Sequence, residues 1–201
     1  MKIICIGRNY LEHAKEMGKH ITKYPIFFLK PDTSLISKKQ PFFLPNFSEN
    51  IHYEAELVYK IKKVGKSIDP IFSKDYYEKV GLGIDFTARD LQARCKSNGH
   101  PWEIAKSFDQ SALVSEHFFD VNSIKDLNFS LLKNGEIVQK GNANEMVFNI
   151  DQIISYISKY ITLKIGDLIF TGTPSGVGSV KIGDKLEGFI NDTRVFSLNI
   201  K

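Results

Sequence analysis

Two acidic side chains stand close enough in the sequence to share a cation. Residues 52–58 read HYEAELV, so acids occupy alternate positions. If this segment is a β-strand, His52, Glu54 and Glu56 lie on one face, because side chains alternate along a strand. The two acidic positions are then about 7 Å apart, which lets both carboxylates converge on one ion. The alternative is the solvent-facing polar side of an edge strand.

A third acid, Asp85, ends an otherwise apolar segment that carries Gly81 and Gly83. A carboxylate in such a place is costly to bury unless it is paired or binds a metal. The alternative is that Asp85 caps the helix predicted to follow it. Together with Glu54 and Glu56, Asp85 forms an all-oxygen site that suits Mg²⁺ or Mn²⁺ and, less well, Ca²⁺.

His13 and Glu16 are three residues apart in a segment with helical character. On a helix this spacing makes them neighbours, and a carboxylate beside an imidazole sets its tautomer and raises its basicity. The alternative is a charged helix face. A separate glycine-rich segment, 171–178 (TGTPSGVG), lacks the Gly-Lys-Ser/Thr of a phosphate loop. It predicts a tight turn that offers backbone N–H groups and a hydroxyl to an anion, or simply a loop between strands.

The elements that must position these residues are mostly strands. Asn134-Gly135 and Asn191-Asp192 each separate two strand-like segments and predict hairpins. Apolar periodicity predicts three short helices, at 10–17, 88–96 and 150–161, the last with Asn149 or Asp151 as its cap. The fold class is therefore mainly β with few short helices. The predicted strands are 2–6, 26–30, 52–60, 80–86, 127–133, 136–140, 168–171, 185–190 and 193–199.

Composition and charge narrow the class of protein. The 201 residues carry 15 Phe and 8 Tyr, enough apolar surface for one globular domain, and no linker divides them. No apolar run reaches the roughly 20 residues of a membrane helix, and the first residues do not resemble a signal peptide. The net charge is +4, but the lysines are scattered, which disfavours a nucleic-acid-binding module. Cys5 and Cys95 are 90 positions apart, which predicts buried thiols and a cytoplasmic protein.

Several motifs, in order along nearly the whole chain, resemble the fumarylacetoacetate hydrolase family, in particular its short acylpyruvase and oxaloacetate decarboxylase members. Each motif alone is weak, but their order makes the resemblance specific. One departure is residues 142–146 (NANEM), where a Thr/Ser-rich turn is expected before the Met. The motifs are 7–10 (GRNY) with His13 and Glu16, 25–31 (PIFFLKP), 54–56 (EAE), 83–92 (GIDFTARDLQ), 99–108 (GHPWEIAKSF), 134–135 (NG) and 171–178 (TGTPSGVG).

The resemblance implies a mixed β-sandwich roll that forms a single catalytic domain over residues 1–201, usually as a homodimer. It implies one divalent metal on the three acids and places the His13–Glu16 pair on a lid helix, with Lys106 as a further catalytic group. The implied metal ligands are Glu54, Glu56 and Asp85, and the implied substrate-binding residues are Arg89, Gln92, Lys106, Gly172 and Thr173.

The resemblance also implies a small anionic 2-oxo acid as substrate. The prediction is a metal-dependent hydrolase that cleaves a C–C bond in acylpyruvates, the class of fumarylpyruvate and acetylpyruvate, with decarboxylation of oxaloacetate at the same site. The alternative within the family is a 2-hydroxy-dienedioate isomerase or an oxaloacetate tautomerase. His13 and Glu16 favour hydrolysis, because isomerisation needs no activated water. The non-enzymatic alternative is a basic nucleic-acid-binding module.

Overall fold

The computed structural model describes residues 1–16, 18, 20, 22–37, 40–124 and 126–201. Within these residues, the strands form a seven-stranded, a four-stranded and a three-stranded sheet. The larger sheet contains β1 (Ile3–Gly7), β2 (Ile26–Lys30), β4 (Ala55–Ile61), β5 (Tyr77–Asp85), β7 (Ala112–Val114), β8 (Phe119–Asp120) and β11 (Leu168–Phe170). The four-stranded sheet contains β9 (Asn128–Lys133), β10 (Glu136–Asn142), β13 (Lys185–Ile190) and β14 (Thr193–Asn199). The three-stranded sheet contains β3 (Ile51–Tyr53), β6 (Thr87–Ala88) and β12 (Gly178–Ser179).

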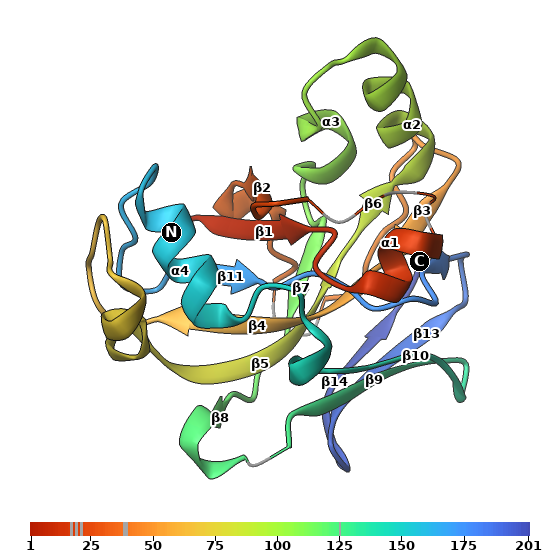
Figure 1. Ribbon diagram of the computed structural model, residues 1–201. Helices are drawn as coiled ribbons and strands as arrows, with labels where there is room; N and C mark the ends of the chain where they lie inside the picture. Colours follow the sequence, from red (N-terminus) through yellow and green to blue (C-terminus); the bar gives the residue numbers. More distant parts are fainter. Residues whose placement is uncertain (17, 19, 21, 38–39, 125) are drawn as a thin grey trace.

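The helices of the described residues are short, and none is long and apolar enough to cross a membrane. In Figure 1, α2 and α3 lie above the large sheet, and the four-stranded sheet lies below it. The α-helices are α1 (Leu11–Glu16), α2 (Arg89–Asn98), α3 (Glu103–Lys106) and α4 (Ile150–Ser158). The 3₁₀ helices are η1 (Asp32–Ser34), η2 (Pro70–Tyr76), η3 (Val121–Ser123) and η4 (Ala143–Glu145).

The large sheet is mixed, with the order β2-β1-β11-β4-β5-β7 and with β8 paired to β5. β1 and β11 run parallel, whereas β4 is antiparallel to both β11 and β5. β13 of the four-stranded sheet packs against β5, so one apolar core fills the space between the two layers. Leu57, Leu82, Leu131 and Leu186 of this core are fully buried. The predicted mixed β-sandwich roll is therefore confirmed.

Local sequence signals account for several elements. Asn134 and Gly135 both have positive φ, at 55° and 87°, as a two-residue hairpin turn requires, and the hairpin of β9 and β10 is confirmed. α4 begins at a capping box in which the Asn149 side chain accepts from the backbone N–H of Gln152. Cys5 and Cys95 are buried free thiols, as predicted.

The structure also corrects the sequence prediction. The predicted strand 52–60 is two strands, because the chain leaves β3 at Tyr53 and enters β4 at Ala55 in a different sheet. β4 lies between β11 and β5, so the edge-strand alternative is wrong. The four residues of α3 were not predicted, and α4 ends before the predicted last turn. Met17, the last residue of the predicted first helix, lies outside the described residues.

Candidate active site

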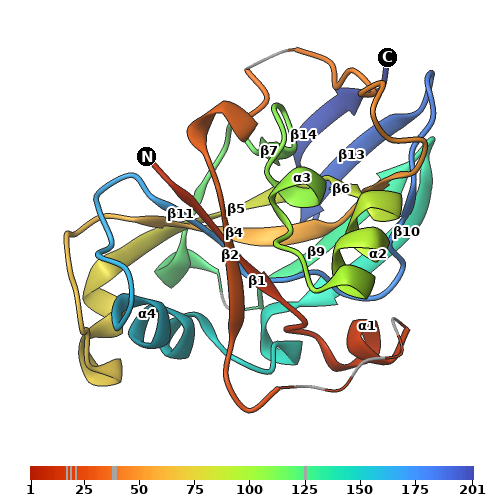
Figure 2. The ribbon, with the colours of Figure 1, turned by 90° about the horizontal axis from the view of Figure 1, so that it is seen from above.

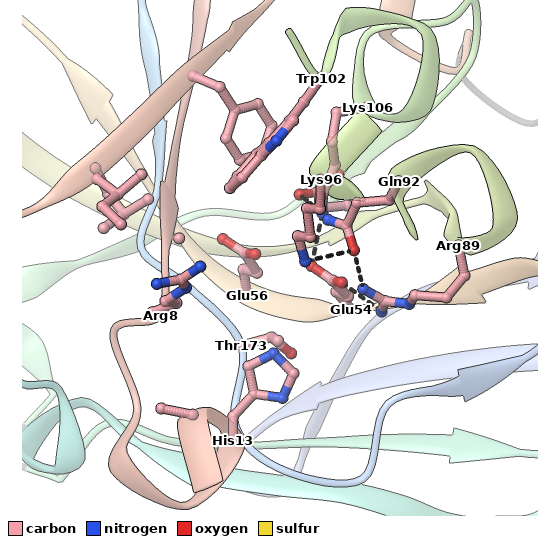
Figure 3. A pocket seen from close by; sticks show the side chains of 16 residues that line it. Arg8, His13, Glu54, Glu56, Arg89, Gln92, Lys96, Trp102, Lys106 and Thr173 are labelled. Atoms are coloured by element: carbon pink, nitrogen blue, oxygen red, sulfur yellow. Dashed lines mark hydrogen bonds and ion pairs between the residues drawn. The ribbon is translucent and has the colours of Figure 1, made fainter. Parts of the chain in front are cut away.

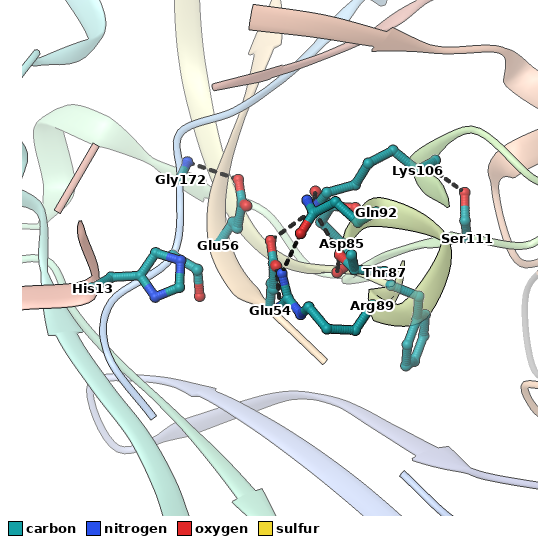
Figure 4. Close-up of polar contacts among 12 residues, drawn as sticks. His13, Glu54, Glu56, Asp85, Thr87, Arg89, Gln92, Lys106, Ser111 and Gly172 are labelled. Atoms are coloured by element: carbon teal, nitrogen blue, oxygen red, sulfur yellow. Dashed lines mark hydrogen bonds and ion pairs between the residues drawn. The ribbon is translucent and has the colours of Figure 1, made fainter. Parts of the chain in front are cut away.

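Three carboxylates meet where β4 and β5 approach the small sheet. Glu56 is the second residue of β4, and Asp85 is the last residue of β5. The Asp85 backbone N–H donates to the carbonyl oxygen of Glu54 over 2.9 Å, which places the two residues side by side. Oxygen atoms of all three carboxylates lie within 4.8 Å of one another, and all three residues are buried. The expected convergence of Glu54, Glu56 and Asp85 is thus present in the geometry (Figure 4).

Two buried lysines compensate part of this negative charge. Lys30 and Lys106 place their Nζ atoms 2.8 and 2.7 Å from the two carboxylate oxygens of Asp85. Lys106 also donates to Glu54 over 2.8 Å and to the Thr87 hydroxyl over 2.6 Å. Burial alone would lower the pKa of Lys106, but the charges of Asp85 and Glu54 raise it above its ordinary value. Lys106 is therefore a fixed cation in this site.

The Lys30 ammonium is completely buried at the end of β2, although sequence analysis assigned it no role. Besides Asp85, it contacts the hydroxyl and carbonyl oxygens of Ser111 and the carbonyl oxygen of Lys106. Lys30 thereby ties β2 to the short helix α3 that carries Lys106.

The alternative role of Asp85 as a helix cap is wrong, because α2 has Ala88 at its N-cap position and no side-chain cap.

Of the three carboxylates, Glu56 is the one that no cation among the described residues contacts. Within the described residues, its only hydrogen-bond donor is the backbone N–H of Gly172, 2.7 Å from Oε2. Burial, and then the charges of Asp85 and Glu54, raise the pKa of Glu56 well above its ordinary value. A buried acid with this environment needs either a proton or a cation. The oxygen donor set, its spacing and this unmet charge fit a hard divalent cation such as Mg²⁺ or Mn²⁺.

The glycine-rich turn fixes Glu56 through the backbone N–H of Gly172. Gly172 has a φ of 94°, and an added Cβ would lie 2.8 Å from Cβ of Asn9, so only glycine fits without a shift. The Thr173 hydroxyl donates to the carbonyl oxygen of Ala55 over 2.9 Å, which fastens the turn to β4. Sequence analysis predicted that an N–H group of this turn would bind an anion, and the anion bound in the structure is the Glu56 carboxylate.

His13 faces the same pocket from α1 and is buried. Its Nδ1 lies 3.0 Å from Oε2 of Glu16, and Oε1 of Glu16 accepts from the backbone N–H of Gly176 over 3.2 Å. The predicted contact between the two side chains is present. Since a carboxylate can only accept, Nδ1 donates to Glu16, and in the neutral imidazole the lone pair is then on Nε2.

Arg89 and Gln92 lie on the first turn of α2 and are linked to the carboxylates. Arg89 pairs with Glu54 at 2.6 Å and donates to Oε1 of Gln92 over 2.9 Å. Burial alone would raise the pKa of Glu54, but Lys106 and Arg89 hold it below its ordinary value. Arg89 therefore orients a carboxylate of the triad as well as lining the pocket.

The pocket enclosed by these residues is small, with a cavity volume of about 50 Å³ (Figure 3). Eight of the predicted site residues line it, whereas Glu16 and Gly172 are not among its lining residues. Arg8, Lys96 and Trp102 also line the pocket, although the sequence assigned them no role: Arg8 and Trp102 stand within the quoted motifs, and Lys96 stands in none. Lys96 follows Gln92 by one helical turn, a spacing that could have revealed it. The lining residues predicted from sequence are His13, Glu54, Glu56, Asp85, Arg89, Gln92, Lys106 and Thr173.

The segment that departs from the family pattern, 142–146, forms a capped turn beside the pocket. The Asn142 side chain accepts from the backbone N–H of Asn144, and the Glu145 carboxylate accepts from the Asn142 N–H. Met146 pairs with Tyr10 in an isolated β-bridge, so this turn contacts the chain just before α1. The departure therefore leaves the carboxylate triad untouched.

A mixed β-roll with a buried carboxylate triad, fixed cations and an imidazole in one pocket defines a class of metal-compatible enzymes. The family model for the fumarylacetoacetate (FAA) hydrolase C-terminal domain matches residues 2–201. The chain belongs to the fumarylacetoacetate hydrolase family, as its motifs predict.

Similar proteins cover almost the whole chain. The mitochondrial oxaloacetate tautomerase FAHD1 of Mus musculus is 42% identical over 99% of this chain and 91% of its own length. The mitochondrial oxaloacetate decarboxylase of Dictyostelium discoideum is 44% identical over 92% of this chain and 87% of its own. The crystal structure of fumarylpyruvate hydrolase from Pseudomonas aeruginosa in complex with Mn²⁺ and pyruvate superposes with a TM-score of 0.92. It is 34% identical and covers 100% of this chain and 89% of that one.

Proposed function

We propose that this protein is a divalent-metal-dependent enzyme for short 2-oxo acids that interconverts the enol and keto forms of oxaloacetate. The observation that carries the proposal is a buried carboxylate triad with one uncompensated acid, Glu56, in the pocket that His13 also lines. Similar proteins over nearly the whole chain are named for the tautomerisation and decarboxylation of oxaloacetate.

The proposed metal ligands are Glu54, Glu56 and Asp85, and the proposed ion is Mg²⁺ or Mn²⁺. Ca²⁺ fits less well, because it prefers six to eight oxygen ligands. A cation bound there acts as a Lewis acid and polarises the 2-oxo group of a substrate. The similar fumarylpyruvate hydrolase was crystallised with Mn²⁺ and pyruvate, a 2-oxo acid.

Lys106 supplies a fixed positive charge next to the reacting carbonyl. Asp85 and Glu54 raise its pKa and hold its ammonium group in the site. This ammonium group stabilises negative charge that develops on the substrate oxygen when an enolate forms. Gln92 and Thr173 complete the polar lining of the pocket. The Gln92 amide N–H groups can donate to the carboxylate end of the substrate, whereas the Thr173 hydroxyl already donates to Ala55 and contributes through its place in the wall.

His13 moves the proton. With Nδ1 donating to Glu16, Nε2 of His13 takes a proton from C3 of keto-oxaloacetate, and the imidazolium then gives this proton to the enolate oxygen, directly or through water, to form the enol; ketonisation is the reverse. Glu16 stabilises the imidazolium that forms and is itself held by Gly176. Decarboxylation needs no base to start it, since the C3–C4 bond breaks to release CO₂ and leaves pyruvate enolate, which then takes a proton at C3 to give pyruvate; in both reactions the negative charge develops on the 2-oxo oxygen. One set of residues therefore serves both reactions of oxaloacetate.

The size of the pocket favours a short substrate. A cavity volume of about 50 Å³ has room for only a few water-sized groups. Oxaloacetate and acetylpyruvate are of similar size, and both need less rearrangement of the walls than a longer acylpyruvate such as fumarylpyruvate does.

The second candidate is hydrolysis of acylpyruvates, and the His13–Glu16 pair specifically favours it. In that reaction His13 takes a proton from water as the water attacks the distal carbonyl, and the C–C bond then breaks to release pyruvate enolate. The similarity to fumarylpyruvate hydrolase supports this candidate. A 2-hydroxy-dienedioate isomerase would use the same metal site without activated water.

The proposal is tested with metal-stripped protein assayed with no metal, with Mg²⁺ and with Mn²⁺. Loss of enol absorbance reports ketonisation of oxaloacetate, and pyruvate release reports decarboxylation and acetylpyruvate cleavage. We expect metal-dependent ketonisation to be the fastest reaction. Glu78→Gln, an exposed acid paired with Lys62, is a control that should match the parent. Full activity without metal would refute the metal-dependent proposal, and faster acetylpyruvate cleavage would make the hydrolase the main activity.

A homodimer, a single catalytic domain over residues 1–201 and a cytoplasmic location belong to the same proposal. Light scattering on the purified chain should give twice the monomer mass. One cooperative unfolding transition, shifted upward by Mg²⁺ with oxalate, is expected of a single domain.

A further inference from the structure

Two cations in the pocket have no role in holding the carboxylate triad. Arg8 directly follows β1, and Lys96 lies on the last turns of α2. Both line the pocket that contains Glu56 and Lys106, and Figure 3 shows their side chains directed into it. They therefore face the space that a substrate must occupy.

These two cations differ from the others in the pocket by their partners. Lys30, Lys106 and Arg89 each pair with a carboxylate of the triad. Among the residues that the structure describes, neither Arg8 nor Lys96 has a carboxylate oxygen within 4.0 Å. Their positive charge is thus available to an anion from outside the chain.

The Lys96 ammonium is positioned by two contacts that leave donors free. Its Nζ donates to Oε1 of Gln92 over 3.0 Å and lies 5.4 Å from the ring centre of Trp102. An ammonium group has three N–H donors, so two of them remain for a ligand. Trp102 holds the cation over its ring without neutralising it.

The backbone of Arg8 is also held in one uncommon conformation. Its φ is 57°, in the left-handed region that residues with a side chain seldom adopt. The next residue, Asn9, is fully buried, and its side-chain amide donates to the carbonyl oxygens of Phe148 and Thr171. The chain on either side of Arg8 is therefore fixed, by β1 before it and by Asn9 after it, which sets where its guanidinium can reach.

The electrostatics of this part of the pocket favour an anion. Burial, and then the charges of Arg89 and Lys106, lower the pKa of Lys96 to about 8, and the charge of Arg8 contributes in the same direction. Only Glu54 opposes this effect among the leading causes. An anionic group bound beside Lys96 and Arg8 would relieve the repulsion among these cations.

We propose that Arg8 and Lys96 bind the second carboxylate of the substrate, so that the pocket selects short 2-oxo acids with an acid group at both ends. The inference rests on the proposed function, in which the carboxylate triad and Lys106 receive the 2-oxo acid end. It adds the part of the pocket that distinguishes oxaloacetate from 2-oxo acids whose far end is neutral. Charge-assisted hydrogen bonds from an ammonium and a guanidinium supply this discrimination.

The test compares oxaloacetate with its 4-methyl ester, which keeps the four-carbon chain, removes the distal charge and adds one methyl group; the variants show how much of the difference is due to charge. Enol–keto conversion is measured for both compounds with Mg²⁺ in the parent, Arg8→Gln, Lys96→Met and Lys96→Arg. The parent should prefer oxaloacetate in kcat/KM by about 10- to 100-fold, the usual worth of a hydrogen bond to a charged group. Arg8→Gln and Lys96→Met should each lose most of this preference, mainly through KM, and Lys96→Arg should restore it.

Arg94→Gln is the matched control, since Arg94 is exposed on the same helix and lines a separate groove. It should keep the preference of the parent. Thermal unfolding of every variant shows whether it is folded, and Lys96→Arg keeps the test valid if Lys96→Met unfolds. A parent that converts neither compound would refute the proposed function. A parent that converts both equally well, or variants that keep the full preference, would overturn this inference alone.

Discussion

Glu56 and Asp85 on one side of the pocket lie on β4 and β5, two interior strands of the large sheet, and are buried. His13 on the other side lies on α1, a six-residue helix whose Glu16 is held by one 3.2 Å hydrogen bond from Gly176. We call Glu54, Glu56 and Asp85 the carboxylate wall, and α1 the base helix. A helix this short has little stability of its own. In the proposed function, the two regions combine an anchor for metal and substrate, fixed by the sheet, with a proton-transfer group on a helix that is able to move.

This difference teaches how the proposed chemistry is divided. The carboxylate wall is fixed by the sheet register, the buried lysines and the Gly172 turn, so its geometry does not depend on a substrate. In the proposed mechanism, the base helix completes the site when Glu16 accepts from the backbone N–H of Gly176, as it does in the structure. A change in the carboxylate wall should therefore abolish binding of metal and substrate, whereas a change in the base helix should impair proton transfer and leave binding intact.

The largest effect is expected from Glu56→Ala. The variant should lose Mg²⁺ binding in calorimetric titration, and turnover should fall by at least about 10³-fold, because Lewis-acid catalysis supplies several kcal/mol. The fold should survive, because removing one of three clustered acids reduces repulsion. Exhaustive EDTA treatment of the parent should abolish turnover in the same way. Undiminished Mg²⁺ affinity in the variant would refute the ligand assignment.

A smaller effect, on the rate of turnover and not on binding, is expected from His13→Ala and Glu16→Ala. Both should keep metal and oxalate affinity, while proton transfer and acylpyruvate cleavage fall by about 10²–10⁴-fold, the usual worth of a general base. The double variant should be no worse than either single one, because the pair acts as one unit. Glu12→Ala changes an exposed acid of the same helix and should match the parent. If His13→Ala turns over as fast as the parent, the base helix has no catalytic role.

The pH dependence of kcat/KM should report the ionisation of Lys96, which belongs neither to the carboxylate wall nor to the base helix. The pKa of Lys96 is about 8, lowered by burial and by Arg89, Lys106 and Arg8, with Glu54 opposing. Lys96 is cationic below this pKa and loses its charge above it, so an anionic substrate should bind more weakly as the pH rises. We expect kcat/KM for oxaloacetate to fall about tenfold between pH 7 and pH 9. The profile of Lys96→Met should lack this step, and an unchanged profile would contradict the assignment.

The smallest effect is a change in protection rather than in activity. If the base helix opens for entry and closes over the substrate, hydrogen exchange of amides 11–16 should slow when oxalate and Mg²⁺ are added. The amides of β4 should change little, since they are already held in the sheet. Equal changes in both segments, or none in α1, would count against the contrast between the two regions.

Much of the carboxylate wall could be predicted from the sequence, because it depends on short-range patterns. Glu54 and Glu56 stand two residues apart, and Asp85 ends an apolar strand, so their types and spacing already indicate a hard cation site. The interruption between β3 and β4 at Glu54 could not be predicted, since it results from the pairing of β3 with β6 and β12 in another sheet.

The cations of the site were harder to assign from sequence. Lys30 contacts Asp85 across 55 positions of sequence, and no local pattern marks such a contact. Lys106 depends on α3, whose four residues are too few for a helical pattern. Lys96 lies one helical turn after Gln92, but an isolated, half-exposed lysine resembles a solvated surface residue.

Binding of oxalate to the Mn²⁺-loaded protein tests most directly whether the carboxylate wall alone binds metal and the 2-oxo acid end of the substrate. Oxalate resembles the 2-oxo acid end of the substrate and cannot react, so its affinity reports the anchor alone. Calorimetric titration of the parent, His13→Ala and Glu56→Ala should give the same dissociation constant for the first two and no binding for the third. Loss of oxalate binding in His13→Ala, or its retention in Glu56→Ala, would contradict the account.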